Sequence, residues 1–172
     1  YTLRTLFPYT TLFRSDIKGV QAFEFVQKLV TNDIAVLEDN QVLYTFMCYE
    51  NGGVVDDLLV YKFSKDHFYL VINAGNIDKD FQWMLDNKGS YDMELTNISN
   101  EVAEVAIQGP KAQKILQKIT DLDLDEIKFF YCKRDVLVDG VKCLISRTGY
   151  TGEDGFEEIG RASCRERVFA GC

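Results

Sequence analysis

The chain has 172 residues, of which 47% are hydrophobic and 27% are charged, and its formal net charge is −8 at pH 7. An acidic chain without a basic run is poorly suited to a phosphate backbone, which argues against nucleic-acid binding. No stretch approaches the roughly 18 apolar residues of a membrane-spanning helix, so no membrane partner is expected. The length is sufficient for one domain core, or for most of a larger one.

Both ends of the chain read as translated sequencing adapter. Residues 5–15, T-L-F-P-Y-T-T-L-F-R-S, are the in-frame translation of a common short-read adapter, and residues 158–168, E-I-G-R-A-S-C-R-E-R-V, match its reverse complement. Two matches to one oligonucleotide, on opposite strands and at opposite ends, are hard to reach by chance. We therefore expect residues 1–15 and 158–172 to be artefact, as with a fusion scar, and residues 16–157 to be the natural piece.

The natural piece is more acidic than the whole chain. Residues 16–157 contain 14 basic and 25 acidic residues, which gives a net charge of −11. Cys48, Cys132 and Cys143 are widely separated and form no C-x-x-C pair, which fits a reducing cytosol. His67 is the single histidine, so no histidine-based triad or metal cluster can be assembled, and we expect no metal.

Helix and strand signals alternate along the natural piece. Taken in chain order, they predict a helix over 22–30, strands over 42–48, 54–63 and 67–73, a helix over 77–88, strands over 91–96 and 102–107, a helix over 110–119, and strands over 129–138 and 141–147. Glycine-containing turns join the first and the last strand pairs as hairpins. Strands joined by short turns and covered by a few helices predict an α+β fold with largely antiparallel sheets.

The second predicted strand carries two adjacent aspartates, Asp56 and Asp57. Because side chains two apart share a face of a strand, Asp57 lies with Tyr61 and Asp56 lies on the opposite face. Both faces are otherwise mostly apolar, so a carboxylate there is costly unless it is paired or faces a wet cavity. Asp56 is nearer the turn, from which it can reach solvent. Two interpretations stay open: Asp57 belongs to a pocket wall, or both aspartates cap the end of a hairpin.

A glycine-rich segment follows the last predicted strand. Residues 147–157 read R-T-G-Y-T-G-E-D-G-F-E, with three glycines that permit tight turns and three carboxylates beside them. The segment is not a P-loop, because the G-x-x-x-x-G-K-[ST] spacing and its lysine are absent. It is either a binding loop whose carboxylates point inward or a sharply turned surface loop.

Five blocks of sequence follow one another along residues 16–157. They are Leu29-Val30-Thr31-Asn32-Asp33, Gly52-Gly53-Val54-Val55-Asp56-Asp57-Leu58, Asn73-Ala74-Gly75-Asn76 with Lys79-Asp80, Gln108-Gly109-Pro110, and residues 147–157. Together they resemble the aminomethyltransferase (T-protein) family of the glycine cleavage system, and the resemblance spans essentially the whole natural piece.

The resemblance implies a tetrahydrofolate-dependent transferase. In that family, lipoylated H-protein is the partner and carries an aminomethyl group on its lipoyl arm. The one-carbon unit passes to tetrahydrofolate, the co-substrate, with release of ammonia. The products are methylenetetrahydrofolate and dihydrolipoyl H-protein. The expected location is the bacterial cytoplasm, or the mitochondrion for a eukaryotic source.

The resemblance also implies roles for individual residues. The folate-facing aspartate of the family is the second of a G-G-x-x-D-D pair and falls on Asp57, which agrees with the strand-face argument. The family's pterin contacts fall on Tyr44, Tyr61, Asn73, Tyr150 and Glu157. A carboxylate can accept hydrogen bonds from the amino and ring N–H groups of a pterin, whose faces an aromatic wall covers. Asp57 would orient folate near the attacking nitrogen and help manage its proton.

The chain departs from the family pattern at both ends of the natural piece. Adapter-like residues replace the family's early D-x-S-H-M-G-E segment, and Glu158 stands where an apolar residue is expected. The family's folate-site arginine and C-terminal barrel would follow Glu157. We therefore predict that the polypeptide as written is not an active enzyme.

Two alternative functions remain open. The first is the folate-binding module of a dimethylglycine or sarcosine oxidising enzyme, which would carry a flavin domain upstream. The second is a non-catalytic folate-binding protein that supports iron–sulfur cluster assembly. That group is marked by a K-G-C-Y-x-G-Q-type motif, which residues 16–157 lack, and the double aspartate favours catalysis.

Overall fold

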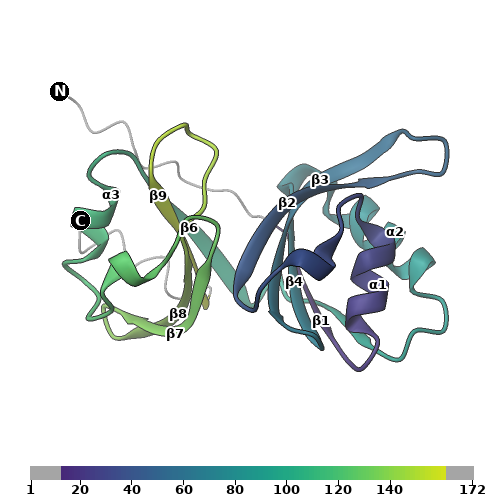
Figure 1. The fold of residues 1–172 in the computed structure, drawn as a ribbon, viewed down its shortest axis with the longest axis horizontal. Coiled ribbons are helices and arrows are strands. Elements are labelled where there is room, and N and C mark those ends of the chain that lie inside the picture. The colour runs from purple at the N-terminus through teal and green to yellow at the C-terminus, as the bar shows by residue number, and fades with distance from the viewer. Residues whose placement is uncertain (1–12, 162–172) are drawn as a thin grey trace. The chain divides into compact units, whose positions relative to one another are not determined.

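The computed structural model describes residues 13–161, which fall into two compact units. Residues 13–99 form the N-terminal unit and residues 100–161 form the C-terminal unit (Figure 1). Each unit has one sheet, whose paired strands are all antiparallel, and its own apolar core. The predicted α+β class is therefore confirmed. No helix in the described part of the chain is long and apolar enough to cross a membrane.

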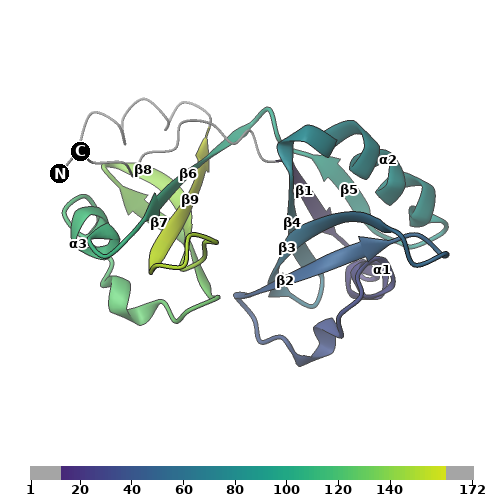
Figure 2. The same cartoon turned by 90° about the horizontal axis from the view of Figure 1, so that it is seen from above.

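The N-terminal unit is built on a five-stranded sheet with the order β2-β3-β4-β1-β5. Its elements are β1 Phe13–Lys18, α1 Ala22–Leu29, η1 Ile34–Val36, β2 Gln41–Cys48, β3 Val54–Ser64, β4 His67–Ile72, η2 Ala74–Asn76, α2 Ile77–Lys88 and β5 Glu94–Asn97. Both α-helices contribute to the apolar core on one face of this sheet (Figure 2).

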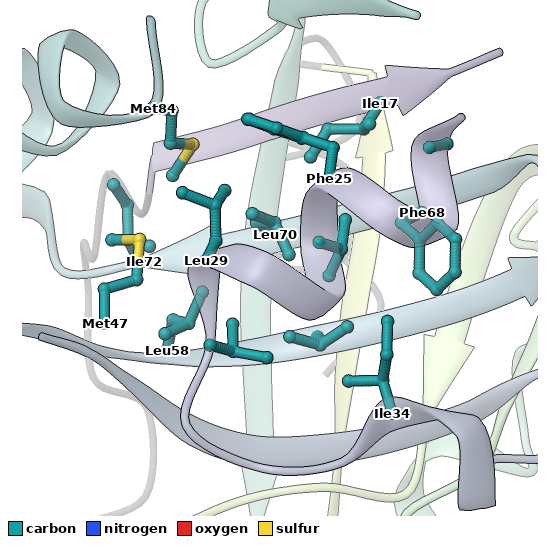
Figure 3. Packing of buried hydrophobic residues seen from close by; sticks show 14 of the residues in the cluster. Ile17, Phe25, Leu29, Ile34, Met47, Leu58, Phe68, Leu70, Ile72 and Met84 are labelled. Atoms are coloured by element: carbon teal, nitrogen blue, oxygen red, sulfur yellow. The ribbon is translucent and has the colours of Figure 1, made fainter. Parts of the chain in front are cut away.

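Apolar side chains that recur at helical spacing pack α1 and α2 against the sheet. Phe25 and Leu29 of α1 lie over Ile17 of β1 and Leu70 of β4, and Met84 brings α2 into the same core (Figure 3). Burying an apolar side chain of this size contributes about 1.5–3 kcal/mol. The stripe predicted from the sequence is thus what holds α1 on the sheet.

The C-terminal unit is built on a four-stranded sheet with the order β6-β9-β8-β7. Its elements are β6 Val102–Gln108, α3 Ala112–Leu116, η3 Leu124–Glu126, β7 Cys132–Val138, β8 Val141–Ser146 and β9 Gly155–Arg161. Its core joins α3 to the sheet through Leu116, Ile107, Ile145 and Phe156.

Two central strands were not expected. β1 pairs with both β4 and β5, and β9 pairs with both β6 and β8. Both strands cross the predicted limits of the natural piece, and β9 includes the last three residues of the predicted glycine-rich loop. β7 begins at Cys132 rather than at residue 129, because Phe130 has a φ of 59° and belongs to a turn.

Candidate functional site

The carboxylate of Asp57 on β3 is held by two side chains from the neighbouring strands. Tyr44 Oη, on β2, donates to Asp57 Oδ2 at 2.9 Å. Asn73 Nδ2, directly after β4, donates to Asp57 Oδ1 at 2.9 Å. Because β3 lies between β2 and β4, the three groups meet at one place on the sheet. The structure thus brings Tyr44, Asp57 and Asn73 together.

This side-chain group is open to solvent. Tyr44 is 48% exposed, and its ring meets the ring of Phe46 edge-on at 5.4 Å between centroids. The hydrogen bond to Asp57 is the main cause that raises the pKa of the Tyr44 phenol, so this phenol is a donor at neutral pH. An ionised carboxylate has about four lone-pair sites. Tyr44 and Asn73 use part of that capacity, and further donors can bind Asp57.

Asp56 faces the opposite side of β3, as strand alternation predicts, but it does not reach solvent. It is only 6% exposed, so the expectation that it escapes near the turn is wrong. The reason is tertiary: Lys79 of α2 donates to the carbonyl of Val55, which places α2 against this part of β3. Asn73 Nδ2 also donates to Asp56 Oδ1 at 3.1 Å.

Asp80 of α2 is fully buried and interacts with the carboxyl group of Asp56, although Asp56 Oδ2 and both Asp80 oxygens have no hydrogen-bond donor within the described residues. Burial, followed by the contact with Asp56, raises the pKa of Asp80 to about 7, although Lys79 Nζ lies 2.8 Å from Asp80 Oδ1. Burial also disfavours ionised Asp56, but hydrogen bonds with Asp80, Asn73 and Asn76 outweigh it and lower the pKa of Asp56. These opposite pKa shifts favour a proton on Asp80 rather than on Asp56.

In the sequence, Asp80 belongs to the block of residues 73–80 that resembles the aminomethyltransferase family, but no function is predicted for it. A signal was available, since Asp80 shares a helix face with Ile77 and Met84 at spacings of three and four residues. A carboxylate on an apolar helix stripe requires a partner in the interior. The stripe alone did not identify that partner as Asp56.

Tyr61 is on β3 four residues beyond Asp57 and is fully buried. It pairs with Val42 on β2 and Tyr69 on β4. Its contact with a pterin stays a prediction.

The glycine-rich segment of the C-terminal unit closes around Gln108. A Cβ atom at Gly149 or Gly155 would lie 2.1 or 2.3 Å from Gln108 Oε1. Gln108 Nε2 donates to the carbonyl of Thr148 at 2.9 Å and to that of Phe156 at 3.3 Å. Two of the three glycines are therefore required by the packing of one buried side chain.

Two of the three carboxylates of this segment, Asp154 and Glu157, have contacts within the C-terminal unit. Arg147 Nε donates to Asp154 Oδ1 at 2.9 Å, and this contact lowers the pKa of Asp154. Glu157 is buried on β9 and accepts a hydrogen bond from Thr148 Oγ1. Tyr150 is 87% exposed. One carboxylate of the segment is thus buried and another is paired at the surface, and the predicted pterin contacts of Tyr150 and Glu157 stay predictions.

Among residues 13–161, no group of three or more His, Cys, Asp or Glu residues is placed to hold a metal. Cys48, Cys132 and Cys143 form no disulfide bond with one another. Burial raises the pKa of Cys132 to about 12, which keeps it protonated at neutral pH.

The family model of the GCVT N-terminal domain matches residues 4–170. The chain belongs to this family. GCVT-domain relatives include the aminomethyltransferases of Alkaliphilus metalliredigens (strain QYMF) and Thermoanaerobacter sp. (strain X514), each 64% identical over 152 residues. The match covers 88% of this chain and 41% of each relative. The chain thus spans about two fifths of the length of the curated relatives it matches.

Solved structures agree with this GCVT assignment. The glycine cleavage system aminomethyltransferase T from Bartonella henselae superposes with a TM-score of 0.85 at 28% identity, over 96% of this chain and 44% of that one. Heterotetrameric sarcosine oxidase from Corynebacterium sp. U-96 has a TM-score of 0.71 at 16% identity, over 96% of this chain and 80% of that one. The second similarity concerns the fold alone.

Proposed function

We propose that this chain is the folate-binding part of an aminomethyltransferase of the glycine cleavage system. The reaction moves the one-carbon unit from aminomethyl-dihydrolipoyl H-protein to tetrahydrofolate. Two folate N–H bonds are replaced by bonds to the methylene carbon; one proton leaves with ammonia and the other goes to the dihydrolipoyl sulfur. Tetrahydrofolate is the co-substrate and lipoylated H-protein the partner. Because the relatives are bacterial, the proposed location is the bacterial cytoplasm.

The observation that carries this proposal is the partly exposed carboxylate of Asp57, fixed by Tyr44 and Asn73. A pterin presents an amino group and ring N–H groups, which are donors that match the remaining lone pairs of a carboxylate. A carboxylate held from two sides would bind folate in one orientation. Its charge would stabilise positive charge on the attacking nitrogen, or accept the proton of that nitrogen.

Tyr61, Tyr150 and Glu157 complete the proposed pterin contacts. The support for them is the resemblance of the chain to the family rather than a contact with Asp57. Exposed Tyr150 offers an aromatic face, and the carboxylate of Glu157 is held on β9 by a hydrogen bond from Thr148 Oγ1.

The fold of sarcosine oxidase makes a folate module of an amine-oxidising enzyme the second candidate. Identity favours the first candidate, since the aminomethyltransferases are 64% identical to this chain and the sarcosine oxidase is 16% identical. The iron–sulfur assembly alternative receives no support from these relatives.

The test uses a full-length enzyme in which residues 16–157 of this chain replace the matching segment of the Alkaliphilus metalliredigens aminomethyltransferase. In this chimaeric enzyme, Asp57→Asn is expected to lower kcat for methylenetetrahydrofolate formation by about 100-fold or more, the contribution of a general acid or base. Asp66→Asn, an exposed change in the turn between β3 and β4, is the control and leaves kcat unchanged. Normal aminomethyl transfer by Asp57→Asn would contradict the catalytic assignment.

We also propose that residues 1–15 and 158–172 are translated adapter sequence, although the family match extends into both flanks. Ser15 on β1 and Glu158 on β9 are buried, and neither Ser15 Oγ nor Glu158 Oε2 has a hydrogen-bond partner within the described residues. An unsatisfied buried polar group costs about 1–3 kcal/mol. Re-assembly of the source reads with adapters trimmed should replace both flanks. Unchanged flanks in independent reads would refute this origin.

A further inference from the structure

A continuous series of polar contacts leads from the interior of the N-terminal unit to Asp57. It begins at fully buried Asp80 on α2 and continues to Asp56 on the inner face of β3. Lys79 joins the two elements at this point, because its Nζ lies 2.8 Å from Asp80 Oδ1 and donates to the carbonyl of Val55, next to Asp56. Asn73, at the end of β4, contacts Asp56 and then Asp57 on the other face of the same strand. The series joins three elements that are separate in the sequence.

Asn73 is the link in this series. Its Nδ2 lies 3.1 Å from Asp56 Oδ1 and 2.9 Å from Asp57 Oδ1, and 3.3 Å from the carbonyl oxygen of Asp57. A side-chain amide has two N–H groups, so it serves both carboxylates only when its plane is fixed between them. Any movement of Asp56 therefore changes the orientation of the amide that holds Asp57.

Asp56 is itself held by Asp80. Apart from the ion-pair contact of Lys79 with Asp80, neither Asp56 Oδ2 nor the two Asp80 oxygens receive a hydrogen bond from another donor group in the described part of the chain. A proton on Asp80 supplies a donor between the two carboxyl groups. Without it, two buried carboxylates would face each other and repel.

We propose that Asp80 is a positioning residue for aminomethyl transfer: it donates a hydrogen bond to Asp56, and through Asp56 and Asn73 it fixes the carboxylate of Asp57 for folate. This inference rests on the proposed function of Asp57. Asp80 itself touches neither substrate nor the reacting atoms.

The surroundings of Asp80 favour its donor form. The charged groups that face it are Asp56 from β3 and Lys79 from its own helix. Burial and Asp56 oppose ionisation more strongly than Lys79 promotes it, and they raise the pKa of Asp80 to about 7.

Asp80→Asn in the chimaeric enzyme provides the decisive test. Asparagine has nearly the same shape and keeps a donor at every pH, whereas Asp80 loses its proton as the pH rises through about 7. We expect the ratio of kcat between the variant and the parent to rise at least about threefold between pH 6 and pH 8.5. Asp78→Asn, an exposed change in the first turn of α2, should give a constant ratio. A constant ratio for Asp80→Asn as well would overturn the inference.

Asp80→Ala removes the donor altogether. We expect kcat to fall about tenfold at pH 6.5, the effect of one hydrogen bond of about 1.4 kcal/mol, with an unchanged KM for H-protein and near-parent activity in Asp80→Asn. If Asp80→Ala does not fold, the pH dependence of kcat in Asp80→Asn tests the positioning function by itself. NMR of the Asn73 side-chain amide gives a readout without turnover: its shift should titrate near pH 7 in the parent and not in Asp80→Asn. A shift that titrates equally in both would overturn the inference.

These outcomes separate the two proposals. If Asp57→Asn retains normal transfer, the proposed function of Asp57 fails. If Asp57→Asn is inactive while Asp80→Asn and Asp80→Ala behave like Asp78→Asn, only the positioning function of Asp80 fails.

Discussion

Asp56 and Asp57 are adjacent on β3 but face opposite sides of the sheet, and one amide group, Nδ2 of Asn73, donates to both carboxylates. Asp56 is enclosed with Asp80, whereas Asp57 is partly exposed beside Tyr44. Asp56 therefore connects the site to the interior through its contacts with Asp80 and Asn73, whereas the carboxylate of Asp57 is accessible to a ligand.

The first prediction concerns the phenol of Tyr44. Its hydrogen bond to Asp57 holds the pKa of Tyr44 above the ordinary tyrosine value, because ionisation of the phenol would remove the donor. Asp57→Asn should therefore lower the pKa of Tyr44, as measured by NMR titration of the tyrosine ring carbons. Asp66→Asn is the control and should leave this titration unchanged. The same Tyr44 pKa in Asp57→Asn would mean that the contact is absent in solution.

The second prediction concerns the dependence of stability on pH. The pKa of Asp80 is about 7 in the folded state against an ordinary value of 3.8, so the folded state binds this proton more tightly. The contribution is fully present below about pH 4 and is lost as the pH rises towards 7. Asp56 has a lowered pKa and acts in the opposite direction, losing its contribution as the pH falls below its ordinary range.

Urea unfolding at pH 5 and pH 8 tests this sign. Relative to the parent chain, Asp80→Asn should be more stable at pH 8 than at pH 5, because the asparagine cannot ionise. Asp78→Asn should show no such change between the two pH values. A parent-to-variant difference that is the same at both pH values contradicts the prediction.

The third prediction concerns Glu158 in β9. It pairs with Val105 on β6 and Ile145 on β8, and its contact in this environment is a hydrogen bond from Cys143 Sγ to Glu158 Oε1 at 2.9 Å. Burial raises the pKa of Glu158, so its ionised form destabilises the fold as the pH rises above about 4.5, its ordinary value. Glu158→Val should stabilise the 172-residue chain by about 1–3 kcal/mol at pH 7.

Thermal unfolding measures this effect, with an expected rise in Tm of several degrees. The matched control is Glu153→Val, since Glu153 is an exposed glutamate in the preceding loop and its replacement should not raise Tm. The gain at Glu158 should shrink at pH 4, where the glutamate is protonated. A lower Tm for Glu158→Val at pH 7 would show that the glutamate belongs in this strand.

The fourth prediction concerns Gly155 and Gln108. A methyl group at Gly155 would meet Gln108 Oε1 at 2.3 Å, so Gly155→Ala should destabilise the chain by about 1–3 kcal/mol. In a Gln108→Ala background the same change should cost much less, because the obstructing side chain is gone. Gly75→Ala is the control, since its Cβ would meet no atom within 4 Å. Equal costs in both backgrounds, measured by urea unfolding, would exclude this packing explanation.

The local sequence determined much of the secondary structure. Apolar spacing located α1 and α2, and the glycine-containing turn located the hairpin of β2 and β3, because these signals depend on neighbours only a few residues apart. Strand alternation also placed Asp56 and Asp57 on opposite faces. The resemblance to the aminomethyltransferase family added Tyr44 and Asn73, which the structure places against Asp57.

Only the tertiary structure decided which charged side chains are buried and which groups they contact. Asp56 could not be assigned to the interior from its strand, since the group that encloses it, Asp80, comes from a helix 24 residues later in the chain. The central positions of β1 and β9 likewise depend on pairing with strands distant in the sequence. Gly149 and Gly155 were visible in the sequence, but the side chain that leaves no room for a Cβ atom at either position, Gln108, lies on another strand. Periodicity acts along the chain, whereas burial and hydrogen bonding are settled by which segments meet in space.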